Sequence, residues 1–145
     1  LNVIASDHAT HALDEKERGL ENIWKSPPGL PAIESMLPLL LTEVKKGKLS
    51  LERLFECAST NPAKIIGLYP KKGSIRVGSD ADLVVIDLKK DSVIRGENSK
   101  AKTHWTPYEG WKTQGVVEAT YVRGIEIYSD WEIVGKPGKG EFLKL

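Results

Sequence analysis

The 145-residue sequence has a single cysteine, no strong excess of charge of either sign and no long apolar run. With only Cys57 present, an internal disulfide is excluded, as is typical of a protein in a reducing compartment. The 21 Lys and Arg residues nearly balance 20 Asp and Glu, so net charge favours no nucleic-acid or anionic-membrane partner. No run approaches the roughly 20 apolar residues of a membrane span, and no signal-peptide pattern is seen. We expect a cytoplasmic protein that binds neither nucleic acid nor membrane.

The composition is that of a globular chain, with 40% apolar and 28% charged residues. The length corresponds to about one average domain. The pattern changes after Pro70, from a strand, a loop and helices to a β-rich sequence. We therefore predict two parts, residues 1–70 and residues 71–145, the second ending in an irregular tail from residue 136.

Hydrophobic periodicity predicts the elements of the first part. The apolar run LNVIA at residues 1–5 predicts a strand buried on both faces, and residues 8–26 predict a long loop. Apolar residues at helical spacing predict three helices, at residues 31–47, from Ser50 as N-cap, and at 63–67.

Short β-rich runs bounded by turn residues predict the strands of the second part. These runs are residues 73–78, 81–88, 116–128 and 131–134. The third run carries Arg123-Gly124 between two alternating stretches, which predicts a hairpin.

The densest group of reactive side chains is the run SDHATH, where the predicted first strand meets the loop. In α/β barrels that end of a strand carries catalytic groups, and a carboxylate such as Asp7 there can ligate a metal or accept a proton. From these residues alone, a turn capped by Asp7 with two solvated histidines is the favoured interpretation, because a single D-H-x-x-H is a weak signal. Asp7, His8 and His11 offer three donors, but His104 is distant and no H-x-H or H-E-x-x-H completes a zinc site.

Two other features have both a functional and a structural interpretation, and the local sequence favours the structural one for each. Pro27-Pro28-Gly29 forms either a rigid turn that presents backbone donors to an anion or an ordinary stop before a helix. The aromatic run HWTPY at residues 104–108 forms either a binding surface or a patch that packs one part on the other. Cys57 is predicted to be a small core residue.

Six blocks occur in order along nearly the whole chain. They are SDHATH, PPGLPAIESMLPLLL, LSLERLFECASTNPAKIIGL, GSIRVGSDADLVVID, SKAKTHWTPYEG and VVEATYVRGIEIY. In this order they resemble the C-terminal part of dihydroorotases in the cyclic amidohydrolase superfamily. Single blocks such as GSDADLVV occur across many amidohydrolases, whereas the ordered series is specific.

The resemblance implies an α/β fold, a C-terminal fragment of an amidohydrolase (β/α)8 barrel of the TIM type. Residues 1–70 would supply the last strand, the active-site loop and helices, and residues 71–145 part of a small β-sandwich. It also implies a zinc-dependent hydrolase that reversibly opens dihydroorotate to N-carbamoyl-L-aspartate in pyrimidine biosynthesis.

The resemblance further implies roles for four residues. Asp7 would ligate zinc and act as the general base that passes a proton to the leaving ring nitrogen, because a carboxylate beside a divalent metal stays ionised. His11 would bind the substrate carboxylate as a hydrogen-bond donor. Backbone groups near Pro28 and Gly29 would help hold the same substrate.

The sequence departs from the family pattern in several respects. Thr10 stands where the family usually has Pro, and Ala32 where it usually has Gly. The H-x-H motif, the bridging lysine, the middle histidines and the substrate arginine are not in this sequence, and a complete barrel needs roughly 250 residues. We therefore expect the isolated chain to correspond to the C-terminal third of an enzyme and to be inactive alone.

Two other functions stay open. One is a non-catalytic assembly module with a carbamoyltransferase partner, and the other is hydrolysis of another cyclic amide, as by dihydropyrimidinase, hydantoinase or allantoinase. His11 favours dihydroorotase over dihydropyrimidinase and allantoinase. The first strand and the apolar stripe at 33–44 are expected to bury against barrel elements outside this sequence, so the isolated chain should self-associate or bind the missing N-terminal barrel portion.

Overall fold

The apolar stripe after Pro31 forms the longest helix, α2 (Ile33–Lys45), as predicted. In the computed structural model, which describes residues 1–143, this helix packs on strand β2 (Lys112–Val122). Leu41 is 1% exposed there, because Gly115 (φ 95°) leaves room for it; a Cβ at Gly115 would lie 2.9 Å from the Leu41 Cβ. The expectation that the whole stripe is reserved for outside elements is therefore wrong for Leu41, whereas Ile33 stays 56% exposed.

A second helical segment follows, and Ser50 caps it as predicted by accepting a 3.1 Å hydrogen bond from the Arg53 N–H. The segment runs through α3 (Leu51–Phe55), a π-helical turn η3 (Glu56–Thr60) and α4 (Asn61–Ile65). Cys57 is 1% exposed, which confirms its predicted place in the core.

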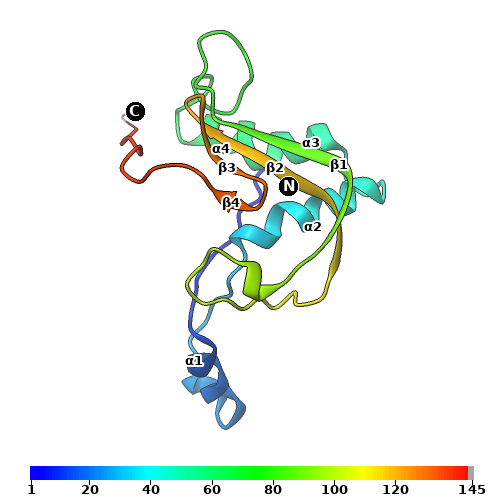
Figure 1. Cartoon of the computed structure of the whole chain (residues 1–145), viewed down its shortest axis with the longest axis vertical. Helices are drawn as coiled ribbons and strands as arrows, with labels where there is room; N and C mark the ends of the chain where they lie inside the picture. The colour runs from blue at the N-terminus through cyan, green and yellow to red at the C-terminus, as the bar shows by residue number, and fades with distance from the viewer. Residues whose placement is uncertain (144–145) are drawn as a thin grey trace.

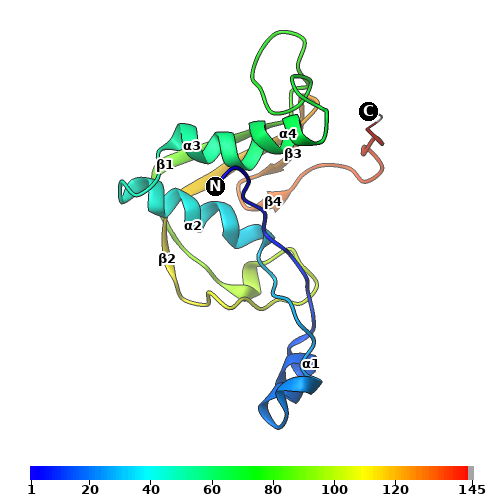
Figure 2. The same cartoon turned by 180° about the vertical axis from the view of Figure 1, so that it is seen from behind.

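The second part forms an antiparallel sheet in the order β1-β2-β3-β4. Its other strands are β1 (Leu83–Val93), β3 (Ile125–Ser129) and β4 (Glu132–Ile133). Arg123 and Gly124 both adopt left-handed φ, 48° and 76°, as a tight hairpin turn requires, so the predicted hairpin is confirmed. Figure 2 shows α2, α3 and α4 together on one face of this sheet.

The strand predicted at residues 73–78 is wrong. These residues form turns and bends, with Ile75 79% exposed and Val77 fully exposed. Gly73 and Gly78, with φ of 75° and 90°, bound a stretch that pairs with no strand of the described residues. Residues with high β propensity do not form a strand unless a neighbouring strand pairs with their backbone N–H and C=O groups.

The strand predicted at residues 1–5 does not form either. The segment lies against the helices instead: the Ile4 N–H donates to the Cys57 carbonyl at 3.0 Å, and the Asn61 side chain donates to the Asn2 carbonyl at 2.9 Å. No described strand lies beside it, so its backbone lacks the ladder that a strand needs.

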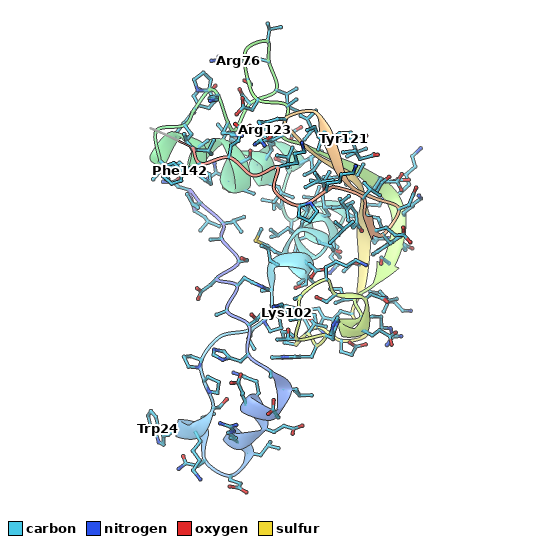
Figure 3. All side chains as sticks on the ribbon, turned by 60° about the vertical axis from the view of Figure 1, so that its left-hand side comes forward. Trp24, Arg76, Lys102, Tyr121, Arg123 and Phe142 are labelled. Carbon is cyan, nitrogen blue, oxygen red and sulfur yellow. The ribbon has the colours of Figure 1, made fainter. Side chains whose placement is uncertain are left out.

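Residues 8–26 form an arm that extends away from the body (Figure 1). The predicted loop contains three short helices, α1 (Leu13–Glu17), η1 (Arg18–Leu20) and η2 (Ile23–Lys25). Trp24, 92% exposed, lies at the far end of the arm, opposite the loop that carries Arg76 (Figure 3).

The irregular tail is confirmed for residues 136–143, which form no helix or strand; Lys144 and Leu145 lie outside the described residues. Within residues 1–143, no helix combines the length and apolar character that crossing a bilayer requires.

Candidate active site

Two segments of the predicted site lie side by side where the arm joins the body. The Ala9 N–H donates a hydrogen bond to the Leu30 carbonyl at 3.2 Å, and His8 pairs with Leu30 as an isolated parallel bridge. Gly29 has φ 105°, and a Cβ on it would lie 2.5 Å from the Ala9 Cβ. The two contacts bring the SDHATH run against Pro28 and Gly29.

Asp7 lies at the entrance to this pairing and is exposed. Its φ of 46° is unusual for a residue other than glycine, although aspartate tolerates this region better than most. Its carboxylate accepts no hydrogen bond from residues 1–143, so Asp7 is not a turn cap. The group is left free for a ligand.

His8 has a structural role that the sequence did not indicate. Its Nδ1 accepts hydrogen bonds of 3.1 Å from the N–H groups of both Ala32 and Ile33. These amides begin α2 and have no partner within the helix, so His8 satisfies them. Because Nδ1 accepts, the proton of a neutral His8 ring is on Nε2.

His11 lies in the first turn of the arm, with its side chain 33% exposed. Its Nδ1 is 3.4 Å from Glu15 Oε2, which also accepts a 2.9 Å hydrogen bond from the Ala12 N–H. The carbonyl of His11 accepts a 2.7 Å hydrogen bond from the Trp105 indole N–H. Glu15 therefore orients the ring of His11, and Trp105 fixes its backbone carbonyl.

Lys16 was not singled out from the sequence. Its ammonium donates to the Pro27 carbonyl at 2.6 Å and to the Gly29 carbonyl at 3.2 Å. The lysine thus joins α1 to the turn that contains the predicted substrate-binding backbone.

Glu34 is a second residue that the sequence did not indicate. One carboxylate accepts hydrogen bonds from the Ser99 hydroxyl at 2.6 Å, the Lys100 N–H at 3.0 Å and the Ala101 N–H at 3.1 Å. With Trp105, it attaches the connection between β1 and β2 to the site. This favours the interpretation of residues 104–108 as a packing patch, in which Tyr108 and Trp111 also meet edge to face at 5.3 Å.

The described residues do not form a metal site by themselves. Within residues 1–143, no group of three His, Cys, Asp or Glu side chains is placed to hold a metal ion. The free carboxylate of Asp7 suits one ligand position, because carboxylate oxygen is a common zinc ligand. Nδ1 of His8 is excluded, since its lone pair is used by α2. Within residues 1–143, Asp7 is a candidate for one ligand position, and no complete ligand set is present.

The sequence model of the amidohydrolase family matches residues 3–127. The chain belongs to the amidohydrolase family. It is 38% identical to the L-hydantoinase of Paenarthrobacter aurescens, over 99% of this chain and 31% of that protein. It is 43% identical to the dihydroorotase of Pyrococcus furiosus, over 96% of this chain and 31% of that protein. The solved L-hydantoinase (dihydropyrimidinase) from Arthrobacter aurescens superposes with a TM-score of 0.94 at 38% identity, covering 98% of this chain and 32% of that chain.

The chain spans about a third of the length of the curated relatives that it matches. It corresponds to their C-terminal part. The predicted family and the predicted α/β class of a C-terminal barrel fragment are confirmed. The division at residue 70 and the roles of Asp7, His11, Pro28 and Gly29 stay predictions.

Proposed function

We propose that this chain is part of a zinc-dependent hydrolase that opens cyclic amides, with dihydroorotate as its substrate and N-carbamoyl-L-aspartate as its product. The observation that carries the proposal is the pairing of the SDHATH run, which contains Asp7, with the segment that contains Pro28 and Gly29. The chain matches relatives named L-hydantoinase and dihydroorotase over 99% and 96% of its length. Dihydroorotate and hydantoin both contain a ring amide, so one reaction class covers both names.

Asp7 is suited to move the proton in this reaction. It is exposed and accepts no hydrogen bond from residues 1–143, so its lone pairs are available. In the proposal, it accepts a proton from the attacking water and delivers it to the ring nitrogen as the amide bond breaks. Zinc, when bound by Asp7 and by ligands from outside this chain, supplies Lewis-acid polarisation of the ring amide.

His11 distinguishes dihydroorotate from rings without a carboxylate. Glu15 faces Nδ1 of His11, and Nε2 has no hydrogen-bond partner within residues 1–143. With Nδ1–H directed at Glu15, the imidazolium form of His11 would also donate from Nε2 to the carboxylate of dihydroorotate. A charge-assisted hydrogen bond of this kind is stronger than a neutral one.

A hydantoinase or dihydropyrimidinase activity is the second candidate. The match to L-hydantoinase covers 99% of this chain, and the solved enzyme superposes closely. A hydantoin ring needs the Pro28–Gly29 backbone but has no carboxylate for His11.

The test compares dihydroorotate, hydantoin and dihydrouracil as substrates of the full-length enzyme that contains this chain, with and without His11→Ala. We expect dihydroorotate to be preferred, and His11→Ala to raise KM for dihydroorotate alone. A preference for hydantoin that survives His11→Ala establishes the second candidate. Full-length protein that opens no cyclic amide refutes both and favours the assembly module with a carbamoyltransferase partner.

The proposed place of the reaction is the cytoplasm, in pyrimidine biosynthesis. The lone cysteine supports a reducing compartment.

A further inference from the structure

We infer that Lys16 is a positioning residue that holds the Pro28–Gly29 peptide in place for the ring amide of the substrate. The inference rests on the proposed function for its substrate, and on the geometry of this chain for the anchoring itself. It starts from where the ammonium of Lys16 lies.

The ammonium of Lys16 donates hydrogen bonds to the two carbonyls on either side of the Pro28–Gly29 peptide unit. It donates to the Pro27 carbonyl at 2.6 Å and to the Gly29 carbonyl at 3.2 Å. The unit between them consists of the Pro28 carbonyl and the Gly29 N–H. Neither group has a hydrogen-bond partner among residues 1–143. Lys16 thus fixes the turn at two points and leaves one acceptor and one donor for a ligand.

A free peptide unit complements a ring amide, because it offers an acceptor for the ring N–H and a donor for the ring carbonyl. The turn cannot rely on its own hydrogen bonds to keep this unit in place. Pro27 and Pro28 have no N–H to donate, and Gly29 at φ 105° is intrinsically flexible. A cation that bonds two neighbouring carbonyls supplies the missing restraint, and a charged donor makes each bond stronger.

The helix that carries Lys16 also fixes the position of His11 relative to the Pro28–Gly29 turn. Glu15, its neighbour on α1, lies 3.4 Å from Nδ1 of His11. One short helix therefore aligns His11, which would bind the carboxylate, and the turn that would bind the ring. Lys16 forms no ion pair with residues 1–143, so its charge is directed to the turn alone.

The first measurement is backbone hydrogen exchange of the Ala32 and Ile33 amides, which follow the turn and donate to Nδ1 of His8, in the full-length protein without substrate. Lys16→Met removes the donor and keeps the chain length, whereas Lys16→Arg restores a cationic donor. Lys25→Met removes the same charge from the exposed end of the arm and is the matched control. We expect about 10-fold faster exchange in Lys16→Met only, with partial rescue by Lys16→Arg. Equal exchange in Lys16→Met and the unchanged protein overturns the anchoring role.

The second measurement is steady-state kinetics with dihydroorotate. Misplacing a binding group by about 1 Å costs on the order of 100-fold, so we expect Lys16→Met to lower kcat/KM by about 10- to 100-fold. The loss should fall mainly on kcat, because the His11 contact with the carboxylate remains. Kinetics of Lys16→Met equal to those of Lys25→Met overturn the link to the substrate. If the unchanged enzyme opens no ring, the proposed function fails by itself, and hydrogen exchange still decides the anchoring.

Discussion

The indole nitrogen of Trp105 donates a 2.7 Å hydrogen bond to the carbonyl of His11, a residue 94 positions earlier in the chain. This bond joins the connection between β1 and β2 to the segment that carries Asp7. Its loss leaves a partly buried carbonyl without a partner, and such a loss costs about 1 to 3 kcal/mol.

Trp105→Phe tests this link, since it removes the donor and keeps an aromatic ring. We expect the thermal unfolding midpoint to fall and KM for dihydroorotate to rise, because the backbone of His11 is released. Trp24→Phe is the control, since Trp24 is 92% exposed at the end of the same arm. Identical behaviour of the two variants would contradict the link.

Asp7→Asn tests the proton transfer. Asparagine keeps the size and tolerates the φ of 46°, so stability should not change. Ring opening by the full-length enzyme should fall by about 100- to 10,000-fold. Metal analysis of the purified protein should also show a lower zinc content. Asp14→Asn on α1 serves as the charge control, and full activity in Asp7→Asn would remove the residue from the mechanism.

Gly29→Ala tests the close approach of the two site segments. The added Cβ would meet the Ala9 Cβ at 2.5 Å, in addition to the strain of φ 105°. Gly47→Ala has comparable left-handed strain, φ 73°, but nothing within 4 Å of its new Cβ. We therefore expect Gly47→Ala to lower stability by about 1 to 3 kcal/mol with activity retained. Gly29→Ala should abolish ring opening, and equal activity of the two variants would exclude the contact as the cause.

Glu109 makes stability depend on pH. The Gly96 N–H at 2.7 Å, followed by the Arg95 guanidinium at 3.1 Å, lowers the pKa of Glu109 below its ordinary value of 4.5. A lowered folded-state pKa stabilises the protein above about pH 4.5, and this contribution is lost as pH falls through the folded value. The unfolding midpoint of Glu109→Gln should therefore fall less steeply with decreasing pH than that of the unchanged protein. If the unfolding midpoints of Glu109→Gln and the unchanged protein fall equally with decreasing pH, the contribution of Glu109 is contradicted.

The isolated chain exposes large apolar side chains on several elements. Ile33 on α2 is 56% exposed, Ile65 on α4 is 71% exposed, and Ile66 beside it is 54% exposed. We propose that these residues bind the N-terminal barrel portion, or a second copy of the chain when that portion is missing. Light scattering of the isolated chain should show association that the added N-terminal portion removes. A stable, monodisperse monomer would contradict the proposal.

The sequence by itself determined the elements whose signals are local. Helix α2 follows from apolar spacing, the Ser50 cap from its hydroxyl at a helix start, and the hairpin from the Arg123-Gly124 turn. The ordered blocks also identified the family, because they span nearly the whole chain. These features depend on residues a few positions apart, and periodicity reports such distances directly.

Only the tertiary structure decided which groups hold the site. His8 reaches the N–H groups at the start of α2 across 24 residues, and Glu34 reaches the Lys100 N–H across 66. No local pattern encodes such pairs, because their partners are backbone groups that any residue carries. The same reason explains the wrong strand at residues 73–78. A β-strand needs a neighbouring strand that forms backbone hydrogen bonds with it. The local sequence does not show whether such a strand lies beside residues 73–78.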